Sequence, residues 1–197
     1  MKNKRRIYLL IGLLILSLAG LWTFKKFNFN TTFSVGQQID SLNGVYVYYN
    51  GSVDNVTGRN TTVDGYNLGL KYQCVEFVKR YYYEHLKHKM PDGYGHAKDF
   101  FENSLKDGQK NNKRDLTQYT NPSNSKPKVN DLLIFDGTSI NKFGHVAIIS
   151  NVKESEIEII QQNPGPHSNA RETYTLESKN GKWKIKNKRI LGWLRKD

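Results

Sequence analysis

The sequence predicts an α+β fold, in which one helix packs on an antiparallel sheet behind a separate apolar helix at the N-terminus. Three observations predict it: an unbroken apolar run after a cluster of cations, one long segment with helical periodicity, and a series of short strand-like segments in the last third. Helix first and strands afterwards is an α+β order. The 197 residues suit one domain with a short appendage.

The N-terminal apolar run covers residues 7–24 and follows four cations, Lys2, Lys4, Arg5 and Arg6. As a helix, its 18 residues would extend about 27 Å, close to the hydrocarbon thickness of a bilayer. Two interpretations are open, a cleaved signal peptide and an uncleaved signal anchor. We favour the anchor, because no clean small-x-small cleavage site precedes the polar sequence.

The charge distribution predicts how the chain is oriented in the membrane. More positive charge lies before the apolar run than directly after it, which predicts a cytoplasmic N-terminus. We therefore expect a basic cytoplasmic segment (1–6), a transmembrane signal anchor (7–24), a stalk (25–35) and a folded domain (36–197). The expected location is the cell membrane, single-pass, with the folded domain on the extracytoplasmic side.

The first half of the folded domain contains one clear helix. Residues 44–49 are rich in valine and tyrosine and predict a strand, whereas residues 50–67 read as a loop. Apolar side chains recur at helical spacing in residues 72–89, which predicts a helix. A shorter helix is expected within 97–105, followed by a polar loop over 106–128.

The second half predicts the sheet. Residues 131–135, 143–152 and 156–162 are short apolar or alternating runs typical of strands. Residues 182–188 alternate lysines with apolar side chains, and residues 190–194 would complete the sheet.

The chain is strongly basic, with a formal net charge of +12. Such a surface attracts polyanions, including anionic lipid, acidic wall polymers and nucleic acid. The charge is densest between Lys182 and Lys196. No zinc-finger, helix-turn-helix or ribonucleoprotein motif accompanies it, so we expect no nucleic-acid partner.

Cys74 is the only cysteine, which excludes an internal disulfide. It falls at the first turn of the predicted helix, where unpaired backbone N–H groups are expected to lower the thiol pKa and to hold a developing oxyanion. The side chain of Gln73 is either a further oxyanion donor or a surface glutamine. No H-E-x-x-H array occurs, so we expect no metal or cofactor.

A predicted hairpin provides a base for this thiol. With a tight turn centred on Lys153, antiparallel register pairs Ile149 with Ile157, Ala147 with Ile159, and His145 with Gln161. His145, Gln161 and Asn163 then share one face. A histidine that takes a proton from a thiol needs its second ring nitrogen held by an acceptor, and either Gln161 or Asn163 could provide it.

Three stretches carry a family resemblance: YQCVEFVKRYY, LLIFDGTSINKFGHVAIISNV and IEIIQQNPG. Together they resemble the CHAP family of cysteine, histidine-dependent amidohydrolases and peptidases, a branch of the papain-like NlpC/P60-type fold. The Q-C-V-E-F, G-H-V-A-I-I, Q-N and I-L-G-W motifs look closest to the amidase domain of glutathionylspermidine synthetase/amidase. The resemblance covers residues 44–194.

The resemblance implies roles for four residues. The family's nucleophile falls on Cys74 and its general base on His145. The third position, usually a glutamate, falls on Gln161, and the asparagine of the same turn falls on Asn163. Gln161 is a departure, because a neutral amide orients an imidazole but does not stabilise imidazolium as a carboxylate does.

The implied function is hydrolysis of an amide bond through a thioester intermediate. With the domain outside the membrane, peptidoglycan is the expected substrate. Two alternatives are open: an amidase for a small glutathionylspermidine-like conjugate, and a non-catalytic module that binds wall peptide.

Overall fold

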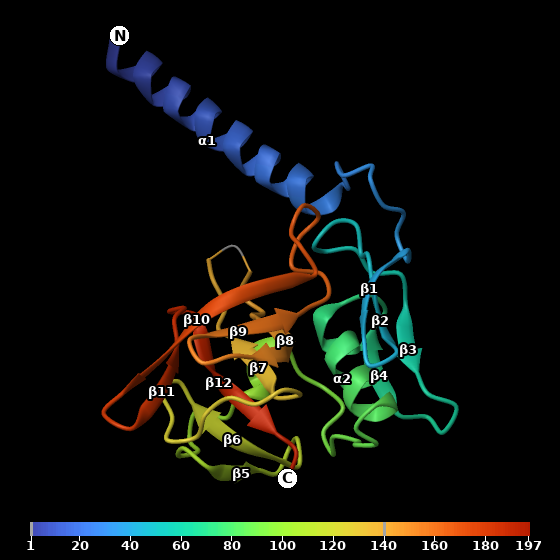
Figure 1. Cartoon of the computed structure of the whole chain (residues 1–197). Coiled ribbons are helices and arrows are strands. Elements are labelled where there is room, and N and C mark those ends of the chain that lie inside the picture. The colour runs from blue at the N-terminus through green and yellow to red at the C-terminus, as the bar shows by residue number, and fades with distance from the viewer. Residues whose placement is uncertain (1, 140) are drawn as a thin grey trace.

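The computed structural model describes residues 2–139 and 141–197, so Met1, the first residue of the predicted cytoplasmic segment, lies outside the described residues. Helix α1 (Lys2–Lys26) projects away from the folded domain (Figure 1). Its stretch Asn3–Thr23 is long and apolar enough to cross a membrane, and a signal sequence would have the same properties. The predicted apolar helix is confirmed, and it extends beyond both predicted ends.

An eight-stranded antiparallel sheet forms the centre of the domain, in the order β11-β10-β9-β8-β7-β12-β6-β5 (Figure 1). Its strands are β5 (Gln109–Asn111), β6 (Leu116–Thr120), β7 (Leu132–Phe135), β8 (His145–Val152), β9 (Glu156–Ile160), β10 (Arg171–Lys179), β11 (Lys182–Ile185) and β12 (Ile190–Arg195). Every pairing within it is antiparallel. The predicted combination of an apolar N-terminal helix with an antiparallel sheet is confirmed.

Helix α2 (Cys74–Glu84) packs beside this sheet together with two small hairpins. One hairpin joins β1 (Gln38–Leu42) to β2 (Val45–Tyr48), and the other joins β3 (Arg59–Thr61) to β4 (Asn67–Leu70). The first residue of α2, Cys74, therefore lies where the helix meets the sheet.

Two apolar clusters cover the two faces of the sheet. On one face, α2 buries Phe77, Val78, Tyr81 and Tyr82 against residues such as Ile148. The other cluster is built from the opposite side chains of the same strands, namely Leu133, Phe135, Ala147, Ile149, Ile157, Ile159, Leu176, Ile185, Ile190 and Trp193. Each large apolar side chain buried in this way contributes about 1.5–3 kcal/mol, so the junction of α2 and the sheet is firmly packed.

Several predicted boundaries were wrong. Helix α2 ends at Glu84 rather than near residue 89, and the expected helix over 97–105 is a single 3₁₀ turn, η1 (Ala97–Phe100). The region 106–128, predicted to be a loop, contains β5 and β6, and β10 was not predicted. Most side chains of β5 and β10 face solvent, and β6 carries mostly polar residues although Leu116 and Gln118 are buried, so hydrophobic periodicity did not reveal these strands.

The predicted stalk packs on the domain over much of its length. The Asn30 side chain donates to the carbonyl of Pro166 at 2.6 Å, and the Tyr49 hydroxyl donates to Asn28 Oδ1 at 2.8 Å. The ring of Phe33 lies 5.6 Å from that of Tyr49. Residues 28–35 therefore connect α1 to the folded domain without forming a free linker.

Candidate functional site

Cys74 is the first residue of α2 and is partly buried. Burial raises its pKa to about 11, and hydrogen bonding to the backbone of Val146, Val75 and Cys74 itself offsets this only in part. The expectation that the helix start lowers the thiol pKa is therefore wrong for this structure. Desolvation of the sulfur outweighs the favourable backbone dipoles.

His145 opens β8, and its Nε2 atom lies 3.0 Å from Gln161 Oε1. The amide nitrogen of Gln161 donates to the carbonyl of Asn169 at 3.2 Å and to Glu172 Oε2 at 3.4 Å. Because these acceptors fix the amide with its oxygen toward the ring, Nε2 is the donor and carries the proton. Nδ1 is then left as the basic nitrogen of the neutral imidazole.

Burial lowers the pKa of His145 to about 4. The hydrogen bond to Gln161 acts in the opposite direction, and the positive charge of Arg189 lowers the pKa further. At neutral pH the site therefore holds a neutral imidazole and a neutral thiol.

Gly144 fixes the backbone directly before His145. Its φ of +75° is strained for any residue with a side chain, and an added Cβ would lie 2.5 Å from the carbonyl oxygen of Phe135 and 2.9 Å from Lys98 Cβ. The close approach of three segments at this point explains why glycine precedes the histidine.

The register of the β8–β9 hairpin differs from the predicted one. Ile149 pairs with Ile159 rather than Ile157, and the ladder contains an irregularity between Ile149 and Asn151. The turn is therefore longer than the predicted tight turn at Lys153. A shift of two residues leaves each side chain on its predicted face, so His145 and Gln161 still meet.

Asn163 does not contact the imidazole. It has a φ of +55°, and its amide nitrogen donates to Gln73 Oε1 at 2.7 Å and to the carbonyl of Val53 at 3.1 Å. Of the two candidates to orient His145, Gln161 makes the contact and Asn163 does not. Asn163 instead ties the turn after β9 to the residue before Cys74.

The side chain of Gln73 does not take the first of its two expected roles, that of an oxyanion donor. Its amide nitrogen donates to the carbonyls of Asn55 at 2.8 Å and Val53 at 3.3 Å. Both amide hydrogens are used, so the side chain is not available as an oxyanion donor. Its contacts hold the loop before β3 against the start of α2.

Gln162 is a residue of the site that sequence reasoning missed. It is fully buried, and its amide nitrogen donates to the carbonyl of Gln73 at 3.0 Å and to Glu76 Oε2 at 2.8 Å. Its Oε1 accepts from the backbone N–H of Tyr48 at 2.8 Å. Its position in the sequence could have indicated this role, because Gln162 follows buried Ile160 by two residues and so shares the strand face toward α2.

Glu76 on α2 makes a buried structural ion pair with Arg80. Its Oε1 lies 2.7 Å from Arg80 Nε. A further amide, that of Asn60, donates to the same oxygen at 2.8 Å. Glu76 therefore anchors the helix that carries Cys74.

The structure brings Cys74 to the residue next to His145. The thiol interacts with the backbone of Val146, although between these two described side chains there is no direct thiol–imidazole hydrogen bond. Apo catalytic pairs are often longer than in the substrate complex. In the described parts of the chain, no cluster of three His, Cys, Asp or Glu residues could hold a metal ion.

Comparison with known proteins gives the family. The CHAP domain model matches residues 63–163. A trypanothione synthetase of Crithidia fasciculata is 30% identical over 132 residues, which are 66% of this chain and 20% of that protein. The chain thus spans about a fifth of this relative, and the match agrees with the resemblance to a glutathionylspermidine synthetase/amidase.

A solved structure, titled "The crystal structure of Ly7917", is 17% identical and covers 64% of this chain and 53% of its own, with a TM-score of 0.40. The family model covers just over half of the sequence. The chain therefore belongs to the CHAP domain family, a family of hydrolases that act on amide bonds.

Proposed function

We propose that the protein is a cysteine-dependent amidase or peptidase, with Cys74 as nucleophile and His145 as general base. The observation that carries this proposal is the 3.0 Å contact between His145 Nε2 and Gln161 Oε1. It occupies one ring nitrogen and leaves Nδ1 as proton acceptor, one residue along β8 from the backbone that the thiol touches. A thiol needs a base held in this way to become a nucleophile.

The proposed reaction has two stages. In the first, Sγ of Cys74 attacks the carbonyl carbon while its proton passes to His145 Nδ1. The C–N bond then breaks, His145 gives the proton to the leaving amine, and a thioester remains. In the second, His145 takes a proton from water, the hydroxide attacks the thioester, and the proton returns to sulfur as the acid leaves.

The shifted pKa values bear on when the proton moves. Burial holds both Cys74 and His145 in their neutral forms at pH 7. A preformed thiolate–imidazolium pair is therefore scarce in the free protein. We infer that proton transfer accompanies formation of the S–C bond, as negative charge passes from sulfur to the carbonyl oxygen.

The start of α2 is the proposed oxyanion site. With the side chain of Gln73 engaged elsewhere, the backbone N–H of Cys74 is the remaining donor among the candidates. The helix dipole adds a favourable field for an anion at this position.

For the substrate we propose an amide of peptidoglycan. This rests on α1 acting as a signal anchor that exposes the domain on the extracytoplasmic side, where peptidoglycan is the abundant amide polymer. The net charge of +12 favours a substrate embedded in an anionic wall. The proposed division of the chain is a basic cytoplasmic segment (1–6), an anchor (7–24), a connecting segment (25–35) and a catalytic domain (36–197).

A second candidate substrate is a small glutathionylspermidine-like conjugate. The observation that favours it is the 30% identity to a trypanothione synthetase. The proposed chemistry would be the same, and only the group on either side of the amide would change.

Both substrates can be tested with the full-length protein in detergent. We expect it to release new amino groups from purified peptidoglycan, and Cys74→Ser to release none. Turnover of glutathionylspermidine with no release from peptidoglycan would transfer the assignment to the second candidate. Retention of both activities in Cys74→Ser would contradict the proposed role of Cys74 as nucleophile.

A further inference from the structure

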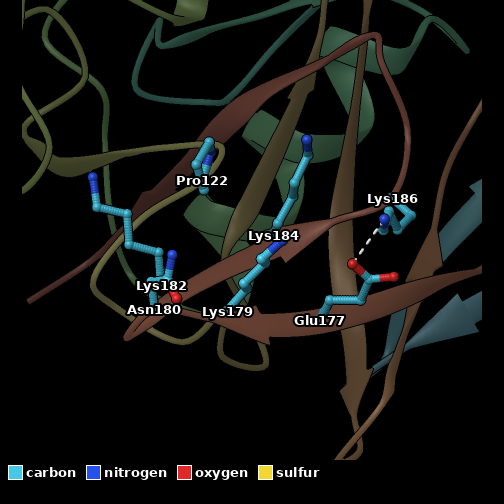
Figure 2. A pocket seen from close by; sticks show the side chains of 7 residues that line it. All are labelled: Pro122, Glu177, Lys179, Asn180, Lys182, Lys184 and Lys186. Carbon is cyan, nitrogen blue, oxygen red and sulfur yellow. Dashed lines mark ion pairs between the residues drawn. The ribbon is translucent and has the colours of Figure 1, made fainter.

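A cluster of lysines lies on the β10–β11 hairpin, at the edge of the sheet and away from Cys74. Figure 2 shows the side chains that line a shallow hollow there, with a volume of about 550 Å³. They are Pro122, Glu177, Lys179, Asn180, Lys182, Lys184 and Lys186. Strand β11 is three positions from β8 in the sheet order, so this surface is separate from the candidate active site.

The lysines share one face of the hairpin because side chains alternate along each strand. Ile185 and Leu176 form a pair buried in the core, and Lys184 faces Glu177 on the opposite side. Lys179 lies directly opposite Lys182. The alternation therefore separates an apolar inner face from a cationic outer face.

Most of this positive charge is not neutralised by the protein. Glu177 pairs with Lys186, with the two charged atoms 2.7 Å apart (Figure 2). Throughout residues 2–139 and 141–197, no carboxylate forms an ion pair with Lys179, Lys182 or Lys184. Like charges placed directly opposite each other destabilise a hairpin, so the facing pair Lys179 and Lys182 opposes folding unless an anion lies between them.

The spacing of the lysines indicates an extended ligand. Lys182 and Lys184 are two residues apart on β11, which places their side chains about 7 Å apart along the strand, and Lys186 follows just beyond the end of the strand, where it pairs with Glu177. A row of cations at this interval fits a linear chain with regularly repeated anionic groups better than it fits one compact anion. We infer that this lysine face binds a linear polymer of polyol phosphate, the phosphodiester class of polyanion, outside the cell.

The lining of the hollow argues against nucleic acid as its ligand. None of its seven residues is aromatic. The nearest indole, Trp183, is covered by Lys126, whose Nζ lies 4.8 Å from the ring centroid. Proteins that hold single strands stack bases on exposed rings, and this face offers only charge for the backbone. A polymer without bases matches it more closely.

Binding can be measured with the full-length Cys74→Ser protein in detergent, so that no hydrolysis contributes. The probe is purified poly(glycerol phosphate), titrated at several salt concentrations. We expect Lys179→Gln/Lys182→Gln/Lys184→Gln to weaken binding at least tenfold. The slope of log affinity against log salt should become shallower by about 2, from about 0.7 per neutralised charge. Lys87→Gln/Lys106→Gln/Lys128→Gln, which removes the same charge from other exposed sites, should change affinity less than twofold.

Three results would overturn the inference. One is equal weakening by both triple variants, which would reduce the effect to net charge. Another is tighter binding of single-stranded DNA of matched charge, or of phosphatidylglycerol vesicles, than of the polymer. The third is unchanged binding combined with self-association of the hairpin variant in light scattering, since lysines on an edge strand also prevent edge-to-edge pairing. Because the Cys74→Ser protein is used, none of these results depends on the proposed hydrolysis.

Discussion

His145 Nε2 lies 3.0 Å from Gln161 Oε1, and the amide nitrogen of Gln161 lies 3.4 Å from Glu172 Oε2. The carboxylate of Glu172 therefore accepts a hydrogen bond from the glutamine that replaces the family's usual glutamate. The neutral amide fixes the tautomer of the imidazole, and the charge of Glu172 is one hydrogen bond further away. Burial keeps His145 neutral at pH 7 in spite of its hydrogen bond to Gln161, which suits a base that acts only when substrate is bound.

The first prediction concerns Gln161. Gln161→Ala removes the acceptor from Nε2, and we expect kcat to fall about 100-fold, since the base loses its tautomer and its direction. Gln161→Glu should retain activity and raise the His145 pKa, visible as a shifted acid limb of the pH–kcat profile. Its carboxylate would face Glu172, so Glu172→Gln in the same chain should improve it. Full kcat in Gln161→Ala would contradict this role.

Gly144 gives a second prediction with a matched control. Gly144→Ala places a Cβ 2.5 Å from the Phe135 carbonyl oxygen at a φ of +75°, whereas Gly108 has a φ of +80° and nothing within 4 Å of its Cβ position. Both variants pay the left-handed backbone cost of about 1–2 kcal/mol. We expect Gly144→Ala to lose roughly 1–3 kcal/mol more in urea unfolding, because of the overpacking. Equal losses of unfolding free energy in the two variants would show that small shifts of the backbone remove the clash with Phe135.

Stability should depend on pH through His145. Its pKa is about 4 in the folded protein against the ordinary 6.5 of an exposed histidine, so the unfolded chain binds more protons between these two values. Folding stability is then fully present above pH 6.5 and declines as pH falls toward 4. The shift corresponds to at most about 3 kcal/mol, at 1.36 kcal/mol per pKa unit. We expect His145→Gln to remove this part of the decline in chemical unfolding at pH 4.5 and 7. An undiminished slope in the variant would assign it to other groups.

The pKa of the Cys74 thiol is shifted upward, opposite to that of His145, and this predicts how fast the thiol reacts. The Cys74 pKa is raised from 9.0 to about 11, so the folded protein should react slowly with iodoacetamide at pH 7 and progressively faster above pH 9. At pH 8 the unfolded chain in urea should be alkylated about 100-fold faster, reflecting two pKa units of thiolate population. A rate that is high and constant from pH 5 to 8 would instead show a thiolate–imidazolium pair in the free protein.

The sequence was sufficient to predict the parts of the fold with strong periodicity. Helix α2 buries one stripe against the sheet, and β7, β8 and β9 are apolar enough to stand out, so each was predicted near its observed position. The polar strands β5 and β10 could not be recognised in this way. They are held by pairing with neighbours rather than by burial of their own side chains.

The sequence predicted which residues lie at the candidate site more accurately than it predicted their hydrogen-bond partners. Strand alternation alone placed His145 and Gln161 on one face, which is why their contact survived an error in register. The partners of Gln73 and Asn163 come from the loop around Val53, far away in sequence, so no local pattern indicated them. Burial of the thiol, which reversed its expected pKa shift, also depends on packing between distant segments.

The most direct measurement is the search for an acyl group on Cys74 during turnover. Full-length protein incubated with purified peptidoglycan, or with glutathionylspermidine, is quenched in acid and analysed by tandem mass spectrometry. We expect an acyl adduct on the peptide that contains Cys74, accumulating more in the His145→Gln variant if that variant still acylates, because deacylation also needs the base. Cleavage of either substrate at an unchanged rate by Cys74→Ala, with no adduct on the wild-type thiol, would contradict nucleophilic catalysis by this cysteine.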